Sequence, residues 1–263
     1  MSDKLGISAT VELVKETKTV QEVDNTASLL VRTIHAALSP LEKWVMQREY
    51  NLQETKKILE FKLQNVPIEN IITPPSYIAV PALHAISYCM DNEELREMYA
   101  ELLKTAMNSE TVNNVHPTYV EIIKQMSPFE SLVFKEIVTK LVQPCVGFSY
   151  KNKKSRAAYP IQDIVAFYDI EKYPIVPTQI ALENLERLRL IEINRNSKYA
   201  DDHEYQKIIK CMENRIKQFV NDNSNHLDPS EYEVVYNEHV ISVRGFGQFF
   251  ARACLGIDFS NYK

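Results

Sequence analysis

Two helix starts lie close together in His116–Phe134, and this stretch constrains the fold more than any other part of the sequence. Pro117 suits the first position of a helix, where the missing N–H of proline is not needed. Further along, Ser127 and Glu130 have the spacing of a capping box around Pro128. The stretch therefore predicts two consecutive helices with a break before Ser127.

Apolar residues recur at steps of three and four residues through the first half of the chain, which is typical of amphipathic helices. The pattern predicts three helical regions, at 24–66, 71–85 and 92–107. Thr73 and Asn92 are the expected N-caps of the last two. Pro81 is expected to kink its helix or to start a new one. We expect residues 1–23 to form a flexible arm.

The second half of the chain mixes strand and helix patterns. We expect strands at Val146–Tyr150 and 190–193, helices at Ile161–Tyr168, Gln179–Leu188 (capped by Thr178), Tyr199–Val220 and Phe249–Leu255, and a two-stranded hairpin at Tyr232–Val243. This order is typical of a winged helix-turn-helix whose wing contains a long helical insertion near 199–220. A generic α+β domain is the alternative.

The predicted fold class is therefore mainly α. An all-helical domain with a flexible N-terminal arm is expected over residues 1–126, followed by an α+β winged-helix-like domain over residues 127–263. A chain of 263 residues is long enough for one large or two ordinary domains.

The composition is that of a soluble globular protein, with 45% hydrophobic and 25% charged residues. A formal net charge of −5 provides no general attraction to nucleic acid. Only 5 glycines are present against 12 prolines, which argues against a glycine-rich phosphate-binding turn.

The four cysteines are far apart and form no CxxC pair. This spacing favours isolated, reduced thiols in a cytoplasmic protein over a disulfide framework. We see no signal peptide and no run near the roughly 20 apolar residues that a membrane-spanning helix needs, so no transmembrane segment is expected. Peripheral membrane contact by the amphipathic run Ala27–Leu38 stays open.

Three blocks of sequence stand out together. They are Ile68–Val80 (IENIITPPSYIAV), Asn92–Asn108 (NEELREMYAELLKTAMN) and His116–Glu130 (HPTYVEIIKQMSPFE). In order and spacing they resemble the abortive infection alpha (Abi-alpha) family of bacterial proteins linked to phage resistance. Val243–Leu255 (VRGFGQFFARACL) is a weaker match to the family's last segment.

The residues that carry this resemblance are expected to have structural roles. They are Pro74, Pro75, Glu94, Leu95, Leu102, Leu103, His116, Pro117, Glu121, Ser127, Pro128 and Glu130. The resemblance implies a role in antiphage defence by abortive infection, and the family has no established catalytic motif. We therefore expect a non-enzymatic, cytoplasmic protein that acts through a protein partner, with no cofactor and no metal. A homodimer formed through residues 24–66 is one possible arrangement.

Two sets of residues could still support chemistry. His116 with Glu121 could form an acid–base pair, but the position of His116 directly before Pro117 favours a capping role. The sequence Asp201–Glu204 (DDHE) offers metal ligands. Adjacent residues on a helix point in different directions, so a solvated helix start is the favoured interpretation. An enzyme, such as a nuclease, whose site assembles from distant positions is the third hypothesis, after protein binding and nucleic-acid binding.

Nucleic-acid binding is the main alternative to protein binding. The winged-helix interpretation would make Thr178–Leu190 the recognition helix, yet this segment contains two glutamates and two arginines. The compact basic segment lies elsewhere, in a loop that contains Lys151, Lys153, Lys154 and Arg156. Such a loop alone would give only weak, salt-sensitive contact with phosphates.

Overall fold

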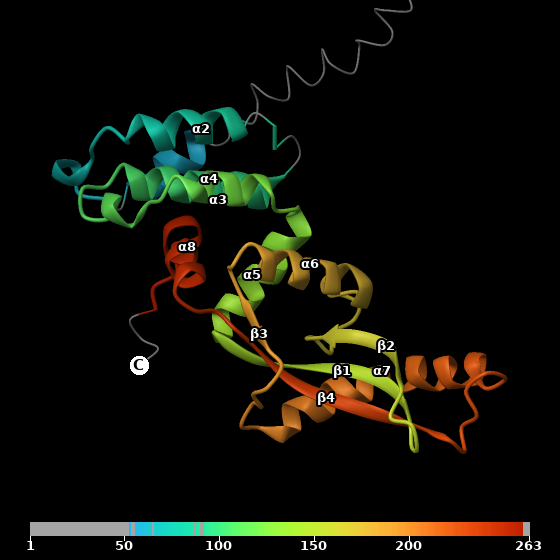
Figure 1. Ribbon diagram of the computed structural model, residues 1–263. Helices are drawn as coiled ribbons and strands as arrows, with labels where there is room; N and C mark the ends of the chain where they lie inside the picture. Colours follow the sequence, from blue (N-terminus) through green and yellow to red (C-terminus); the bar gives the residue numbers. More distant parts are fainter. Residues whose placement is uncertain (1–52, 54–55, 65, 87, 90–91, 260–263) are drawn as a thin grey trace, which may run out of the picture. The chain divides into compact units, whose positions relative to one another are not determined.

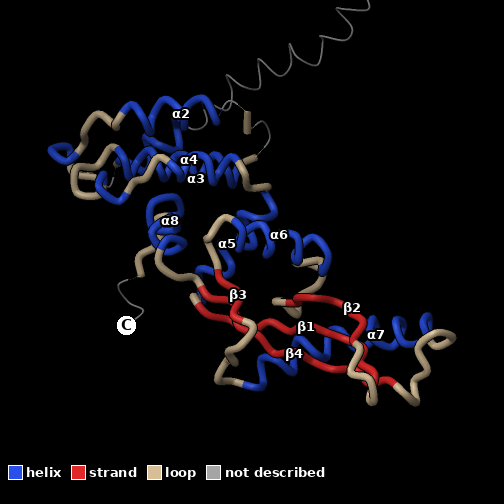
Figure 2. Tube along the Cα trace, viewed as in Figure 1, coloured by secondary structure: helices blue, strands red, loops and turns tan. Residues whose placement is uncertain are grey.

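The computed structural model describes residues 53–259 apart from 54–55, 65, 87 and 90–91. All of them belong to the second of two units into which the chain divides, Asn51–Lys263. They form a helix-rich α+β fold with a four-stranded sheet (Figures 1 and 2). The predicted domain boundary at residue 126 falls within this unit and stays a prediction.

The expected arm at 1–23 and most of the amphipathic region at 24–66 lie outside the described residues. Within that region, residues 56–63 are described and are helical, as predicted. The suggestion of a homodimer through residues 24–66 therefore stays a prediction.

A group of helices precedes the sheet in the chain. It contains the 3-10 helices η1 (Ile68–Asn70) and η2 (Val112–Asn114) and the α-helices α2 (Ser76–Ile86), α3 (Glu93–Ala106), α4 (Thr118–Lys124) and α5 (Pro128–Lys140). The final helix, α8 (Phe246–Leu255), returns to pack against α3 (Figure 1). Helix α3 contacts α2, α4, α5 and α8, so it is the centre of this part of the core.

The predicted N-cap of α3 is confirmed, because the Asn92 side chain accepts a hydrogen bond from the Leu95 N–H at 2.8 Å. The expected start of α2 at Thr73 is wrong, since the helix begins at Ser76, after the two prolines. Pro81 lies inside α2 and does not end it. The helix continues because its apolar face, including Ile78 and Ala82, is fully buried on both sides of the proline.

The capping box at the start of α5 is confirmed. The Ser127 Oγ accepts a hydrogen bond from the Glu130 N–H at 3.2 Å, and the Glu130 Oε2 accepts one from the Ser127 N–H at 2.6 Å. Pro128 lies in the first turn of α5. Backbone N–H groups there have no acceptor within the helix, so the missing N–H of proline removes no hydrogen bond. Pro117 has helical dihedral angles and directly precedes α4, so both predicted helix starts exist.

The sheet is antiparallel and has the strand order β2-β1-β4-β3. Its strands are β1 (Val142–Asn152), β2 (Ala158–Val165), β3 (Glu192–Asn194) and β4 (Tyr232–Ser242), and two further helices are α6 (Ile175–Arg187) and α7 (Asp202–Asn223). Cys145, Ile164 and Ile241 belong to one hydrophobic core with α5 and α6. Val146, Phe148 and Val165 belong to a second core with α7. Both faces of the sheet are therefore covered by helices (Figure 2).

This double coverage explains the first of two wrong predictions. The helix expected at Ile161–Tyr168 is largely strand β2, because Ile164 and Val165 face different cores and the apolar run does not alternate. The hairpin expected at Tyr232–Val243 is the single strand β4. Its expected break at Asn237-Glu238 stays paired in register with β1.

The remaining predictions for this half stand with one correction. Helices α7 and α8 and the strands at 146–150 and 190–193 are confirmed in type, with shifted ends. Helix α6 is also present, but it begins at Ile175, and Thr178 is a buried residue inside it and not its cap.

The capping box provides a direct test of the helix start at α5. Replacing Ser127 by alanine should lower the free energy of unfolding by about 1 kcal/mol, because the Glu130 N–H loses its acceptor. Urea denaturation followed by circular dichroism measures this change. Ser197→Ala, at an exposed serine in the loop after β3, is the matched control and should leave the midpoint unchanged. Equal midpoints for the two variants would contradict the structural role of the cap.

Candidate functional site

The residues shared with the family blocks lie along the helical part of the fold and do not converge on one point. Leu95, Leu102 and Leu103 are buried in α3, and Pro74 and Pro75 precede α2. Glu94 lies in the first turn of α3, where a carboxylate favours the positive end of the helix dipole. That all the shared residues are structural stays a prediction.

His116 caps the start of α4. Its Nδ1 accepts a hydrogen bond from the Thr118 N–H at 3.2 Å, and its ring lies 6.0 Å from that of Tyr119. Glu121 pairs instead with Lys124, at 2.8 Å. The structure thus does not bring together the acid–base pair considered from the sequence.

The Asp201–Glu204 cluster is the start of α7. The Asp201 Oδ1 accepts a hydrogen bond from the His203 N–H at 2.9 Å, so Asp201 is an N-cap, and Glu204 pairs with Lys207. Within the described part of the chain, no group of three or more His, Cys, Asp or Glu side chains is placed to hold a metal ion.

The four cysteines are free thiols. Burial raises the pKa of Cys89 to about 11 and that of Cys145 to about 12, and it also raises the pKa of Cys211 and Cys254. A thiol acts as a nucleophile in its thiolate form, and these shifts disfavour the thiolate at neutral pH.

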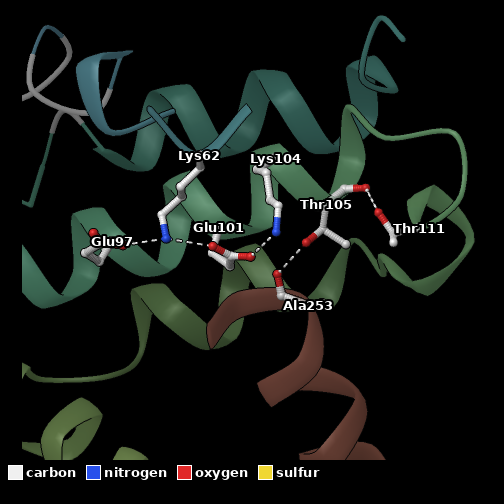
Figure 3. Close-up of polar contacts among 7 residues, drawn as sticks. All are labelled: Lys62, Glu97, Glu101, Lys104, Thr105, Thr111 and Ala253. Carbon is white, nitrogen blue, oxygen red and sulfur yellow. Dashed lines mark hydrogen bonds and ion pairs between the residues drawn. The ribbon is translucent and has the colours of Figure 1, made fainter. Parts of the chain in front are cut away.

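A buried charged cluster lies on α3. Glu101 is only 5% exposed, and its two carboxylate oxygens accept hydrogen bonds from Lys62 at 2.7 Å and from Lys104 at 2.9 Å (Figure 3). Lys62 also pairs with Glu97 at 2.9 Å. Burial by itself would raise the pKa of Glu101, but the hydrogen bonds from the two lysines outweigh it and lower the pKa.

The same part of α3 is hydrogen-bonded to the final helix, α8. The Thr105 Oγ1 donates a hydrogen bond to the Ala253 carbonyl at 3.0 Å, and the Thr111 Oγ1 donates one to the Thr105 carbonyl at 2.8 Å (Figure 3). Gly256 ends α8 with a φ of 67°, and a Cβ there would lie 2.8 Å from the Glu101 Oε1. The positive φ favours glycine here, and a side chain would also require the Glu101 carboxylate to shift.

An apolar groove of about 550 Å³ lies between α2, the first half of α3 and the link from α4 to α5. Its lining consists of Ala85, Tyr88, Cys89, Asn92, Leu95, Tyr99, Ile123, Lys124, Met126 and Pro128. Most of these side chains are apolar, with Asn92 and Lys124 as the polar exceptions. Such a concave apolar surface is suited to accept a hydrophobic group from a ligand or a partner.

The solvent-facing side of α2 is also apolar. Tyr77, Val80 and Leu83 are 60%, 53% and 47% exposed, and they follow one another at a spacing of three residues. The opposite side of the helix, with Ile78 and Ala82, is buried in the core. Helix α2 is thus apolar on both sides, although only one side contacts the core.

The basic loop is the turn between β1 and β2. Two of its four cations contact the segment before β4: the Lys153 Nζ donates a hydrogen bond to the Ser230 carbonyl at 2.8 Å, and Lys154 lies 3.8 Å from Glu231. Lys151 faces Glu233 across the strand pair, and Arg156 has a φ of 60° at the end of the turn. Neighbouring glutamates therefore reduce the positive potential of this loop.

The family model described as abortive infection alpha matches residues 47–254, which is most of the chain. The chain belongs to the abortive infection alpha family. This confirms the resemblance inferred from the sequence blocks, and it associates the chain with abortive infection as a bacterial defence. A search of curated proteins found no match, and a search of solved structures found none either.

Sequence reasoning missed the main polar feature of this Abi-alpha chain, the Glu101 cluster. A sign of it was present, because Glu101 and Thr105 fall on the same side of α3 as the buried Met98 and Leu102. A carboxylate in an apolar stripe requires a partner. Lys104 is a local partner three residues further along α3, but the second partner, Lys62, could not be read from the sequence.

Among the described residues, no helix is long and apolar enough to cross a membrane.

The Glu101 cluster predicts a specific dependence of stability on pH. Because the pKa of Glu101 is lowered by folding, its carboxylate stabilises the fold above its ordinary pKa of 4.5. This stabilisation is lost as the pH falls below 4.5 through the folded-state pKa. At pH 7, Glu101→Gln should lower the free energy of unfolding by about 2 kcal/mol, and the difference from the wild type should shrink below pH 4.5.

Urea denaturation at a series of pH values measures this difference. Glu121→Gln is the matched control, because Glu121 pairs with a lysine three residues away on an exposed surface. It should change the free energy by less than about 0.5 kcal/mol at every pH. A Glu101→Gln effect that stays constant from pH 7 to acid would contradict the assignment.

Proposed function

We propose that this Abi-alpha chain is a non-enzymatic component of abortive infection that binds a protein partner through the exposed face of α2. The observation that supports this proposal is the row of exposed apolar side chains Tyr77, Val80 and Leu83. Exposed apolar patches on soluble proteins commonly mark interaction sites. Aromatic side chains such as Tyr77 are also enriched at protein–protein interfaces.

The groove next to α2 strengthens the proposal. Ala85 comes from α2 itself, and Leu95 and Tyr99 come from the first half of α3. Protein interfaces obtain much of their affinity from a few side chains that fill such pockets. A partner that covers the α2 face could place an apolar side chain in this groove.

Three features of the site residues support a binding role over catalysis. The His116 Nδ1 accepts a hydrogen bond at the start of α4, Glu121 pairs with Lys124, and desolvation raises the pKa of the Cys89 and Cys145 thiols. The free thiols also support a cytoplasmic location, where thiols stay reduced.

A phage challenge tests the α2 face. The wild-type chain, expressed with its neighbouring genes in a susceptible host, should reduce plaque formation, and Val80→Asp or Leu83→Asp should restore it. An exposed charge on this face would have to be desolvated on binding. Ile180→Asp is the matched control, because Ile180 is an exposed apolar residue on α6. Circular dichroism should show that all three variants are folded.

Two outcomes would overturn this proposal. One is full protection by folded Val80→Asp and Leu83→Asp variants, which would exclude the α2 face. The other is unchanged plaque formation with the wild-type chain across a broad phage panel, which would exclude the defence role itself.

A winged-helix nucleic-acid-binding regulator is the second candidate. The strand order β1-β4-β3, with α6 directly before β3 and α7 between β3 and β4, supports this candidate. Strand β2 stands where the helix before the recognition helix was expected. The basic turn between β1 and β2 would supply the phosphate contacts, although Glu231 and Glu233 lie beside it.

Salt dependence tests this second candidate. If the basic turn binds duplex DNA, affinity should fall steeply as salt rises, because phosphate contacts release counterions. Replacing Lys151 and Arg156 by alanine should then weaken binding and reduce the slope by about two. Fluorescence anisotropy with a random-sequence duplex measures both quantities. Absence of binding at low salt would remove nucleic acid from consideration.

A further inference from the structure

A second pocket, of about 170 Å³, opens at the edge of the sheet beside the start of β1. It is formed by the end of α5, the start of β1, the segment after β2 and the first turns of α7. Its lining consists of Glu136, Lys140, Gln143, Pro144, Ala166, Phe167, Tyr168, Asp169, Lys172, Tyr173, Glu204 and Ile208. None of these residues belongs to the α2 face or its groove.

The position of this pocket follows from the strand pairing. Strand β1 pairs with β4 along its whole length, but its pairing with β2 begins only at Val146. At Gln143 and Pro144 the other edge of β1 therefore has no strand beside it among the described residues. The chain leaves β2 at Val165 and turns through residues 166–173 before α6. The pocket is the space that this turn leaves open.

Gln143 is the unusual residue in the lining. It is only 2% exposed, and its Nε2 has no hydrogen-bond partner among the described residues. Leaving a buried amide without a partner is unfavourable, so proteins rarely keep one without a reason. A ligand that brings a hydrogen-bond acceptor to this amide would supply the missing partner.

The charges in the lining narrow the class of ligand. Glu136 accepts a hydrogen bond from the Tyr173 hydroxyl at 3.0 Å and pairs with Lys172 at 3.6 Å. Glu204 pairs with Lys207, outside the lining. Two lining charges of opposite sign, Lys140 and Asp169, have no ion-pair partner within the described part of the chain, although the Asp169 Oδ1 accepts a hydrogen bond from the Lys172 N–H at 3.1 Å.

The remaining wall is aromatic. The rings of Phe167 and Tyr173 stack on each other with centroids 4.2 Å apart, and Tyr173 is buried. Ile208 of α7 adds an aliphatic side chain. A ligand for this pocket should therefore have one positive group, one negative group and a small apolar part.

We propose that this pocket binds a small zwitterion, namely a free amino acid. Lys140 and the Gln143 amide bind its carboxylate, Asp169 binds its ammonium group, and the aromatic wall contacts its side chain. A purely anionic ligand is disfavoured because three carboxylates and only two lysines line the pocket. This assignment goes beyond the proposed protein-binding role, because it gives the chain a binding site for a small molecule.

Isothermal titration calorimetry on the full chain tests the proposal, with the twenty common amino acids added one at a time at pH 7. At least one should bind with a Kd of about 1 mM or lower. Acetate and butylamine, which each present only one of the two charges, should bind at least about tenfold more weakly. Binding of acetate or butylamine as tight as that of the amino acid would overturn the zwitterion assignment.

Variants identify the pocket as the site. Gln143→Leu keeps the size of the side chain and removes the amide, so the Kd for the amino acid should rise at least about tenfold while the fold is kept or stabilised. Lys140→Ala and Asp169→Asn, at exposed positions, should have a similar effect and keep the test valid if Gln143→Leu does not fold. Lys210→Ala, at an exposed lysine of α7 outside the lining, is the matched control. Failure of every amino acid to bind the wild type, or an unchanged Kd in all three pocket variants, would overturn the proposal.

Discussion

The packing of α8 on α3 is the contact on which the rest of this Abi-alpha structure depends. It joins the last helix of the chain to a helix about 150 residues earlier, through the Thr105–Ala253 hydrogen bond at a sequence separation of 148 residues. Phe250 of α8 also contacts two further helices: its ring lies edge to face with that of Tyr119 in α4, at 5.4 Å between centroids, and tilted against that of Phe134 in α5, at 5.8 Å. Such aromatic contacts add to the free energy of apolar burial. Without this contact the helices before the sheet would lack a large part of their core.

Burying the Glu101 carboxylate beside this contact costs free energy, which other interactions must offset. A carboxylate as buried as Glu101 is unfavourable unless it is paired and hydrogen-bonded. Lys62 and Lys104 meet that requirement, and Lys62 links the helical residues 56–63 to α3. Gly256, at the end of α8, lies beside the same carboxylate, so three segments of the chain meet at Glu101. The cluster therefore specifies how these segments fit together, while the apolar contacts around it provide most of the stability.

The proposed functions use surfaces that the core leaves open. The outer side of α2 is apolar without contacting the core, and the pocket at the start of β1 exists because β2 is shorter than its neighbour. The α2 face and its groove overlap the blocks that carry the family resemblance, since Tyr77 and Val80 belong to the first block. The pocket at the start of β1 lies outside all three blocks.

The sequence by itself determined the features that depend on neighbours along the chain. The Ser127–Glu130 capping box, the Asn92 cap and the helices α3, α7 and α8 follow from local hydrogen bonding and from apolar periodicity, and the family followed from ordered blocks of residues. Tertiary structure decided the rest. Residues 158–165 became a strand because β1 was available to pair with them and two cores could cover both faces. The pairing of Glu101 with Lys62 and the lack of a hydrogen-bond partner for the Gln143 amide also depend on segments that are distant in sequence. Local patterns do not specify such contacts, because the free energy that selects them arises only when the whole core assembles.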